Sequence, residues 1–257
     1  MPSHPWAACG LSRLWVTEAA VGSSDQRGLS APRPSKATHR LRATVVTDTA
    51  LAALALAGIF AVGDWTSRLR HNAVLEYVCK PSTLLALIAV AVALHPAGDL
   101  GARRDWFIAA LCFSLLGDVL LMLPADLFLA GLSAFLLAHI CYVVGFFTRP
   151  PAAWALVISV LGVALVLSPT GWRIIRALEQ QPNLRGPVTF YIVVISVMLV
   201  AALATGNIFA AIGATLFAVS DSAIAWDRFV RSFRAAPVAI MVTYHLGQVG
   251  LVLSLLR

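Results

Sequence analysis

Charged residues are scarce in this 257-residue sequence, in which Asp, Glu, Lys and Arg together make up 12% of the chain. Soluble globular domains carry about 25% charged residues. Hydrophobic residues make up 60% of the chain, and the mean hydropathy is +0.84. A soluble fold of this size has too little interior to bury so much apolar surface. The composition therefore excludes an ordinary soluble enzyme, a disordered chain and a coiled coil.

Acidic residues and cysteines are also few. The chain has 12 Asp and Glu against 19 Lys and Arg, and six of the basic residues fall within residues 1–42. No basic patch is interleaved with aromatic residues, so this charge suits an anionic lipid surface better than nucleic acid. The four cysteines form no Cys-x-x-Cys pair, which argues against a disulfide framework or a thiolate metal site.

Long apolar runs fill most of the chain. We expect residues 1–42 to be a disordered basic tail and residues 43–257 to be one all-α transmembrane domain. Eight runs come close to the roughly 20 residues that cross a bilayer as a helix. They lie at about 43–63, 76–95, 105–123, 126–147, 151–170, 187–205, 207–226 and 235–256.

The turns and the topology follow from the same pattern. Gly206-Asn207 is the only turn signal inside the uncharged run 186–220, so we expect two helices to meet there. The segment between the fifth and sixth runs holds Arg173, Arg176 and Arg185, and we expect it to be the one long loop. An even number of helices places both termini on one side. The basic tail favours the cytosolic face of the plasma membrane for that side.

Ionisable side chains are rare within these runs, and each costs roughly 2.5–3.5 kcal/mol in a membrane helix. Such groups are therefore functional candidates, and here they are Asp118, Asp221, His139, His245 and Lys80. The two helices with an aspartate run in the same direction. Each acid lies about five residues before its helix ends, which predicts a depth of roughly 8 Å below one surface. This equal placing indicates one cavity lined by both acids, and it suggests a 4+4 internal repeat.

Each candidate also has a plain structural interpretation. A buried carboxyl or histidine can satisfy a neighbouring helix, and a lysine near a helix start can reach the interface as an anchor. Hydrogen bonding between helices is the favoured single role for Tyr244 and Gln248.

Polar and aromatic residues recur around the candidates at helical spacing. The motifs are Tyr77-x-x-Lys80-Pro81, Ser114-x-x-Gly117-Asp118, Phe128-x-x-Gly131, Phe135-x-x-Ala138-His139-x-x-Tyr142, Tyr191, Phe217-x-x-Ser220-Asp221 and Thr243-Tyr244-His245-x-x-Gln248. Together they resemble the lysoplasmalogenase (YhhN-type) family of eight-helix membrane proteins over about residues 75–250. One departure is His245, which stands where that family has an aromatic residue such as Tyr.

The resemblance implies that a lysophospholipid is cleaved at its vinyl ether bond to a fatty aldehyde and glycerophosphoethanolamine or glycerophosphocholine. It implies no cofactor and no metal, and it maps the catalytic acids onto Asp118 and Asp221. Membrane lipids are the other expected partners, and Lys80 is expected to meet the phosphate. The substrate-binding candidates are Lys80, Tyr77, His139, Tyr142, Tyr191, Ser220, Tyr244, His245 and Gln248.

Two carboxyls in a low-dielectric pocket suit this chemistry. Protonation of the vinyl ether β-carbon needs a carboxylic acid that keeps its proton, and a carboxylate must steady the resulting cation. The more apolar flanks of Asp118 favour it as the acid. We expect the loss of either carboxyl to abolish turnover. The residues alone leave open a proton-coupled transporter, and a zinc hydrolase with His139, His245 and one Asp as ligands.

Overall fold

The computed structural model describes residues 47–95 and 100–256. The expected basic tail, residues 1–42, lies outside the described residues. The described chain forms α1 (Asp48–Arg70), α2 (Ala73–Ala93), α3 (Leu100–Met122), α4 (Phe128–Phe147), α5 (Ala153–Ala177), α6 (Pro182–Ala204), α7 (Ile208–Ala225) and α8 (Ala236–Leu253). All eight helices are long and apolar enough to cross a membrane. The predicted all-α transmembrane class is confirmed.

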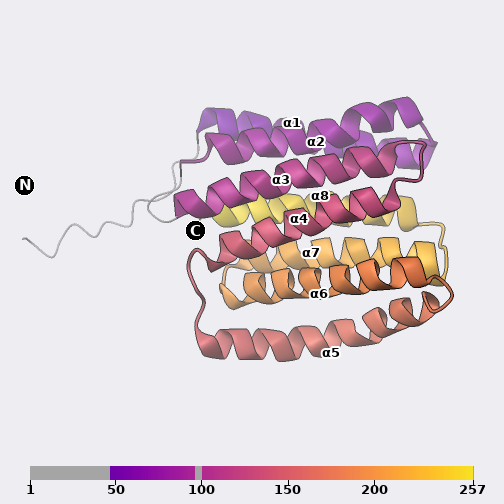
Figure 1. Cartoon of the computed structure of the whole chain (residues 1–257). Coiled ribbons are helices and arrows are strands. Elements are labelled where there is room, and N and C mark those ends of the chain that lie inside the picture. The colour runs from indigo at the N-terminus through magenta and orange to yellow at the C-terminus, as the bar shows by residue number, and fades with distance from the viewer. Residues whose placement is uncertain (1–46, 96–99, 257) are drawn as a thin grey trace, which may run out of the picture. The chain divides into compact units, whose positions relative to one another are not determined.

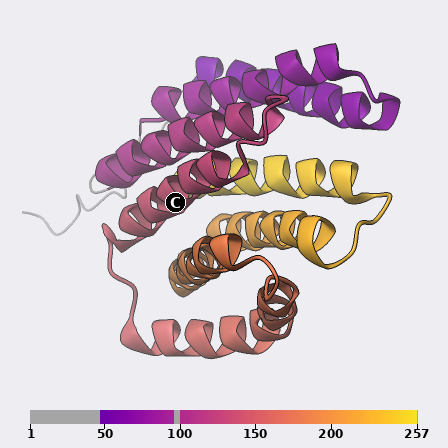
Figure 2. The ribbon, with the colours of Figure 1, turned by 45° about the vertical axis from the view of Figure 1, so that its right-hand side comes forward.

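Figure 1 shows the helices running side by side. The pairs α1–α2, α3–α4 and α7–α8 pack closely as hairpins, and α8 also contacts α1 and α2. In the turned view of Figure 2, α8 lies between the α1–α3 group and α7. We call the end that holds the α1–α2, α3–α4, α5–α6 and α7–α8 connections the hairpin end. It is the right-hand end in Figure 1.

Helices α7 and α8 approach until their backbones touch. A Cβ atom on Gly213 would lie 2.6 Å from the backbone nitrogen of Leu251, and one on Gly247 would lie 2.9 Å from that of Phe217. Only glycine leaves room for such an approach. This contact fixes α7, which carries Asp221, against α8, which carries Tyr244.

The predicted division at Gly206-Asn207 is confirmed. Gly206 has a φ of +67°, a left-handed conformation that glycine adopts without strain. Asn207 then caps α7, because its side chain accepts hydrogen bonds from the backbone N–H groups of Phe209 and Ala210.

Two of the expected boundaries are wrong. α1 was expected to end at residue 63 but runs to Arg70, and the expected long loop at 171–186 is only the segment 178–181. Arg173, Arg176 and Arg185 are therefore helical. Hydropathy marks the part of a helix that lies in hydrocarbon, whereas a helix continues into the interface as long as its backbone bonds are satisfied. The 4+4 repeat stays a prediction.

A π-helical turn, η1 (Trp226–Val230), continues α7 at the hairpin end. The backbone N–H of Arg231 donates to the carbonyl of Trp226 at 2.9 Å, five residues back. Such turns often occur at functional sites, because they re-aim neighbouring side chains. Here the turn carries Arg228 and Phe229, and each lines a different pocket.

Candidate active site

Both carboxylate oxygens of Asp118 contact side chains from neighbouring helices. It lies one turn before the end of α3 and is 1% exposed. Its Oδ1 atom is 3.2 Å from Nζ of Lys80 on α2, and the Tyr244 hydroxyl on α8 donates to Oδ2 at 2.8 Å. Gln248 Nε2 donates to the Tyr244 oxygen at 3.4 Å, and the Tyr142 hydroxyl on α4 donates to Gln248 Oε1 at 2.5 Å. A chain of polar contacts therefore joins four helices and ends at an ion pair.

Asp221 is engaged on one oxygen only. The Tyr191 hydroxyl on α6 donates to its Oδ2 atom at 2.5 Å, and Nε2 of His139 on α4 lies 3.6 Å from the same oxygen. The other ring nitrogen of His139 is 2.5 Å from the carbonyl of Phe135, which can only accept. Nδ1 therefore carries a proton, and Nε2 faces Asp221 as an acceptor when the ring is neutral. No hydrogen bond from the described residues reaches Asp221 Oδ1.

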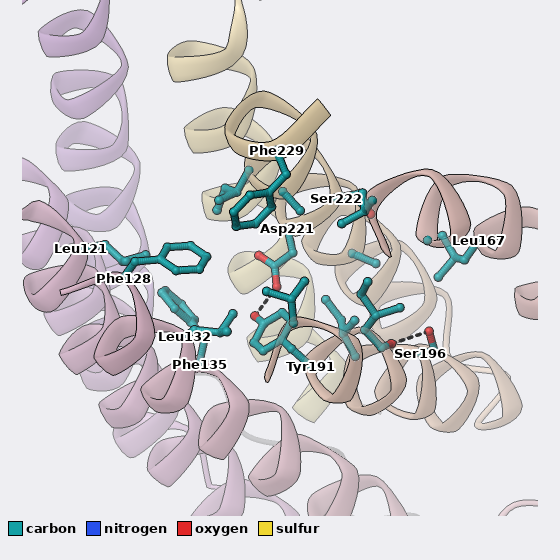
Figure 3. Close-up of a pocket in the computed structure, with 18 residues that line it drawn as sticks. Leu121, Phe128, Leu132, Phe135, Leu167, Tyr191, Ser196, Asp221, Ser222 and Phe229 are labelled. Carbon is teal, nitrogen blue, oxygen red and sulfur yellow. Dashed lines mark hydrogen bonds between the residues drawn. The ribbon is translucent and has the colours of Figure 1, made fainter. Parts of the chain in front are cut away.

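An apolar pocket opens beside Asp221 between α4, α5, α6 and α7. We call it the Asp221 pocket, and its walls include Leu121, Phe128, Leu132, Phe135, Leu167, Ile174, Val188, Tyr191, Ile192, Ile195 and Phe229. Figure 3 shows Asp221 and Phe128 facing the space from opposite sides, with Tyr191 bonded to the acid. The pocket walls are otherwise nearly all hydrocarbon, so the carboxyl is the chemical group that a bound molecule would meet.

Asp118 does not line this pocket, which differs from the expected cavity shared by both acids. Aromatic rings lie between the two clusters. The Tyr244 ring meets Phe217 edge-on at 5.3 Å between centroids, and Phe217 meets His139 at 4.8 Å. The acids thus belong to adjacent polar clusters with a shared apolar wall.

A second, polar pocket lies at the hairpin end, and we call it the end pocket. Its charged lining residues are Arg68, Glu76, Lys80, Asp227 and Arg228. It shares three lining residues with the Asp221 pocket, namely Leu121, Phe128 and Ile224. The two pockets are therefore neighbours, one charged and one apolar.

Of the nine predicted substrate contacts, only Lys80 and Tyr191 line one of these pockets, and the other seven line neither: Tyr77, His139, Tyr142, Ser220, Tyr244, His245 and Gln248. The Tyr77 hydroxyl donates to the carbonyl of Met122 at 3.3 Å, and Ser220 Oγ donates to the carbonyl of Ile240 at 3.0 Å. His245 Nδ1 accepts from Trp65 Nε1 at 3.1 Å, so α1 supplies the partner for the residue that departs from the family pattern. The side chains of Tyr77, Ser220 and His245 thus each join two helices.

The sequence reasoning missed Asp64, which is 0% exposed within α1. No hydrogen bond from the described residues reaches either of its carboxylate oxygens, and Nε of Arg68 lies 3.9 Å from Oδ1. The buried face of α1 could have revealed it, because Ala57, Ala61 and Asp64 follow one another at spacings of three or four residues. Hydropathy alone places the residue in a loop.

The proposed zinc ligands are not gathered in the structure. His139 lies beside Asp221 and His245 lies against Trp65. In the described part of the chain, no group of three or more His, Cys, Asp or Glu side chains is placed to hold a metal ion.

Residues 75–255 match the YhhN family. A lysoplasmalogenase of Mycobacterium bovis is 34% identical over 197 residues, which cover 71% of each chain. The human lysoplasmalogenase TMEM86B is 36% identical over 157 residues, which cover 61% of this chain and 66% of its own. An uncharacterized membrane protein, YhhN of Escherichia coli, is 29% identical over 192 residues, which cover 70% of this chain and 86% of its own. No solved structure matches this chain. By the extent of the family match, the chain belongs to the YhhN family.

Proposed function

We propose that this integral membrane protein hydrolyses the vinyl ether bond of lysoplasmalogens, releasing a fatty aldehyde and a glycerophospho-amine. Two of the relatives above carry the name lysoplasmalogenase. The observation that carries the proposal is the free Oδ1 of Asp221 beside an apolar pocket. Walls of this kind suit a hydrocarbon chain, and Asp221 is the only carboxyl among the residues that line the pocket.

Asp221 is the proposed proton donor. In the substrate, R–CH=CH–O–R′, the acid gives its proton to the carbon next to R, which leaves an oxocarbenium ion at the carbon bonded to oxygen. Water adds to that carbon and returns a proton to the Asp221 carboxylate. The hemiacetal then collapses to R–CH2–CHO and R′–OH, so one residue serves as acid and then as base.

The contacts of Asp221 support this role. No cation among the described residues pairs with it, except where His139 is protonated. A neutral His139 leaves Asp221 without a positive charge beside it, which suits an acid that holds its proton. A charge in an apolar pocket is costly, so the resting acid is favoured in its neutral form.

Asp118 is the proposed fixed carboxylate. The Lys80 ammonium and the Tyr244 hydroxyl both favour a negative charge on it. It does not line the Asp221 pocket, so we propose that it is a positioning residue, holding Lys80 and Tyr244 and adding a negative potential that favours the cation. This reverses the assignment suggested by the apolar flanks of Asp118, because pairing with a cation outweighs the dryness of the flanks.

The proposed location is the plasma membrane, with both termini in the cytosol. The support is the excess of Lys and Arg in residues 1–42. Reporter fusions at Gly98 and at Gln181 are expected to lie on opposite sides, with the Gly98 fusion on the side of the termini. Fusions that report one common side would overturn this topology.

The test of function compares three lysolipids that share a headgroup and differ in one bond. Purified protein in an uncharged detergent receives lysoplasmenyl, saturated lysoalkyl or lysoacyl ethanolamine lipid, and aldehyde and fatty acid are both measured. We expect aldehyde from the lysoplasmenyl lipid and no product from the other two. Fatty acid from the lysoacyl lipid, or no aldehyde at all, would contradict the proposal. Uptake into liposomes without turnover would favour a transporter instead.

A further inference from the structure

The end pocket carries charges of both signs at the mouth of an apolar site. Arg68 of α1, Lys80 of α2 and Arg228 of η1 supply three cations, and Glu76 and Asp227 supply two carboxylates. A ligand with one phosphate and one amine complements this set, because each of its charges meets the opposite sign. A ligand with only an apolar chain would make no use of these charges.

The cations differ in how free they are to meet a ligand. Lys80 is 4% exposed and already paired with Asp118. Among the described residues, the guanidinium of Arg228 forms hydrogen bonds with Asp126 alone, at 3.2 Å from both carboxylate oxygens, in a pair whose side chains are 40% and 75% exposed. An exposed pair of this kind is worth about 0–1 kcal/mol, so a phosphate can readily replace Asp126.

Arg228 is also aimed at the junction of the two pockets. Its guanidinium lies 4.1 Å from the ring centroid of Phe128, which lines both of them. Arg68 is held nearby by Glu76, with 2.6 Å between Nη2 and Oε1. The planar fork of arginine matches the oxygens of a phosphate, and two such groups can grip it from different helices.

Asp227 offers the matching negative charge. Its Oδ1 atom accepts from the backbone N–H of Phe233 at 3.0 Å, and no hydrogen bond from the described residues reaches Oδ2. This residue follows Asp221 on the same stretch of chain, six positions later and beyond the end of α7. A headgroup amine bound there would lie at the polar end of a molecule whose chain runs past Asp221.

We propose that the end pocket binds the phosphate and amine of a lysophospholipid headgroup, with Arg228 and Arg68 on the phosphate and Asp227 on the amine. The apolar chain then lies in the Asp221 pocket, and the bond next to the glycerol lies near the three shared residues. We propose a lipid and not a soluble phosphate because the end pocket shares lining residues with an apolar pocket. The inference deepens the proposed function but makes a claim about binding alone.

The experiment measures binding of saturated ether lipids, which the proposed reaction leaves intact. Wild-type protein, Arg228→Gln and Arg68→Gln are titrated in an uncharged detergent with lysoalkyl phosphoethanolamine lipid and with an alkylglycerol that lacks the phosphate. Each variant should weaken binding of the phospholipid by about 10-fold to 100-fold, and leave the alkylglycerol unchanged. Arg231→Gln and Arg70→Gln are matched controls, since neither residue lines the end pocket, and both should bind like the wild type.

A further variant tests the assignment of the amine to Asp227, because it should change the binding of two lipids in opposite directions. Asp227→Asn keeps an oxygen to accept from Phe233 but removes the negative charge. It should weaken binding of the phosphoethanolamine lipid and strengthen binding of a lysoalkyl phosphate that has no amine. A merely structural role for Asp227 would weaken both lipids equally, and that result would overturn the amine assignment.

Competition separates a headgroup site from a free-anion site. Glycerophosphoethanolamine should displace the phospholipid only weakly, and inorganic phosphate should not displace it at millimolar concentration. Equal competition by inorganic phosphate would show a general anion site. Equal wild-type affinity for phospholipid and alkylglycerol would overturn the proposal. If the variants change lipid binding as expected but the wild type releases no aldehyde, the headgroup site is supported and the proposed reaction is contradicted.

Discussion

The two buried aspartates near the hairpin end differ in how many of their oxygen atoms are occupied. Asp118 has a cation on one oxygen and a tyrosine hydroxyl on the other, and it does not line the Asp221 pocket. Asp221 has both of its contacts on Oδ2, and no hydrogen bond from the described part of the chain reaches its Oδ1 beside the apolar pocket. Two aspartates at the same distance from their helix ends therefore have different contacts, which suit them to different roles. A fully paired carboxylate holds its surroundings in place, whereas a half-paired one can exchange a proton with a ligand.

The largest effect is expected from Asp221→Asn. Asn keeps the size of the side chain but has no proton to give, so kcat for aldehyde release should fall by about 10²–10⁴-fold. The lysoalkyl phospholipid should bind as before, because its headgroup lies elsewhere. Asp126→Asn removes an exposed carboxyl at the same end and should leave kcat unchanged. Near-wild-type turnover in Asp221→Asn would contradict the assignment of Asp221 as the proton donor.

Asp118→Asn should instead lower stability along with turnover. It leaves Lys80 buried without its counter-ion, and breaking a buried pair costs about 3–5 kcal/mol. The midpoint of thermal unfolding should fall by about 10 °C, whereas Asp221→Asn should change it little.

A double variant separates charge pairing from chemistry. Lys80→Met combined with Asp118→Leu removes both charges and should recover most of the lost midpoint without recovering turnover. Unchanged unfolding in Asp118→Asn would mean that the ion pair with Lys80 contributes nothing to the fold.

The pH dependence of activity tests the same difference between Asp118 and Asp221. Activity of the wild type should be bell-shaped, since Asp221 must hold its proton and Asp118 must have lost one. Residual activity of Asp118→Asn should lose the decline on the acidic side and keep the decline on the alkaline side. The measurement is kcat/KM across pH 4 to 10 at constant ionic strength, roughly the range in which a tuned acid and base titrate. A profile that stays bell-shaped in the variant would assign the acidic limb to another group.

Tyr191→Phe should have an intermediate effect. It removes the hydroxyl that orients Asp221, so kcat should fall about tenfold, which corresponds to about 1.4 kcal/mol and to the loss of one hydrogen bond to a neutral group. KM and the binding of the lysoalkyl lipid should not change. A rise in KM with constant kcat would show that the tyrosine contacts the lipid instead of positioning the acid.

The smallest effect is expected from Tyr142→Phe, at the far end of the Asp118 chain. The change removes the hydrogen bond to Gln248 and should cost about 1 kcal/mol of stability, with activity within twofold of the wild type. A loss of activity as large as that of Tyr191→Phe would mean that the whole polar chain takes part in catalysis.

The sequence alone predicted how deep each polar side chain lies along the membrane normal. It did not predict the direction in which that side chain points around the helix axis. The spans, the turn at Gly206-Asn207 and the places of Asp118 and Asp221 near their helix ends were all predicted. Depth alone put the two acids in one cavity. The structure separates them because α8 brings Tyr244 to Asp118 and the ring of Phe217 fills the space beyond it.

Asp64 shows a second limit of the same kind. A charge that interrupts an apolar run marks the end of a span in hydropathy, yet α1 continues for six residues past it. The helix continues because Asp64 lies on the buried face and not toward lipid. Which face a helix buries depends on partners distant in the sequence, here on α2 and α8, which contact α1.

The most direct test of the proposed chemistry is hydrolysis of the lysoplasmenyl lipid in D2O, with the aldehyde reduced to an alcohol as it forms. If the Asp221 acid protonates the vinyl ether carbon, the product gains one deuterium at carbon 2 and Asp221→Asn yields almost no labelled product. Fatty aldehyde incubated alone in the same solvent measures background exchange. Aldehyde released without deuterium at carbon 2, or labelled product at the wild-type rate from Asp221→Asn, would contradict the account.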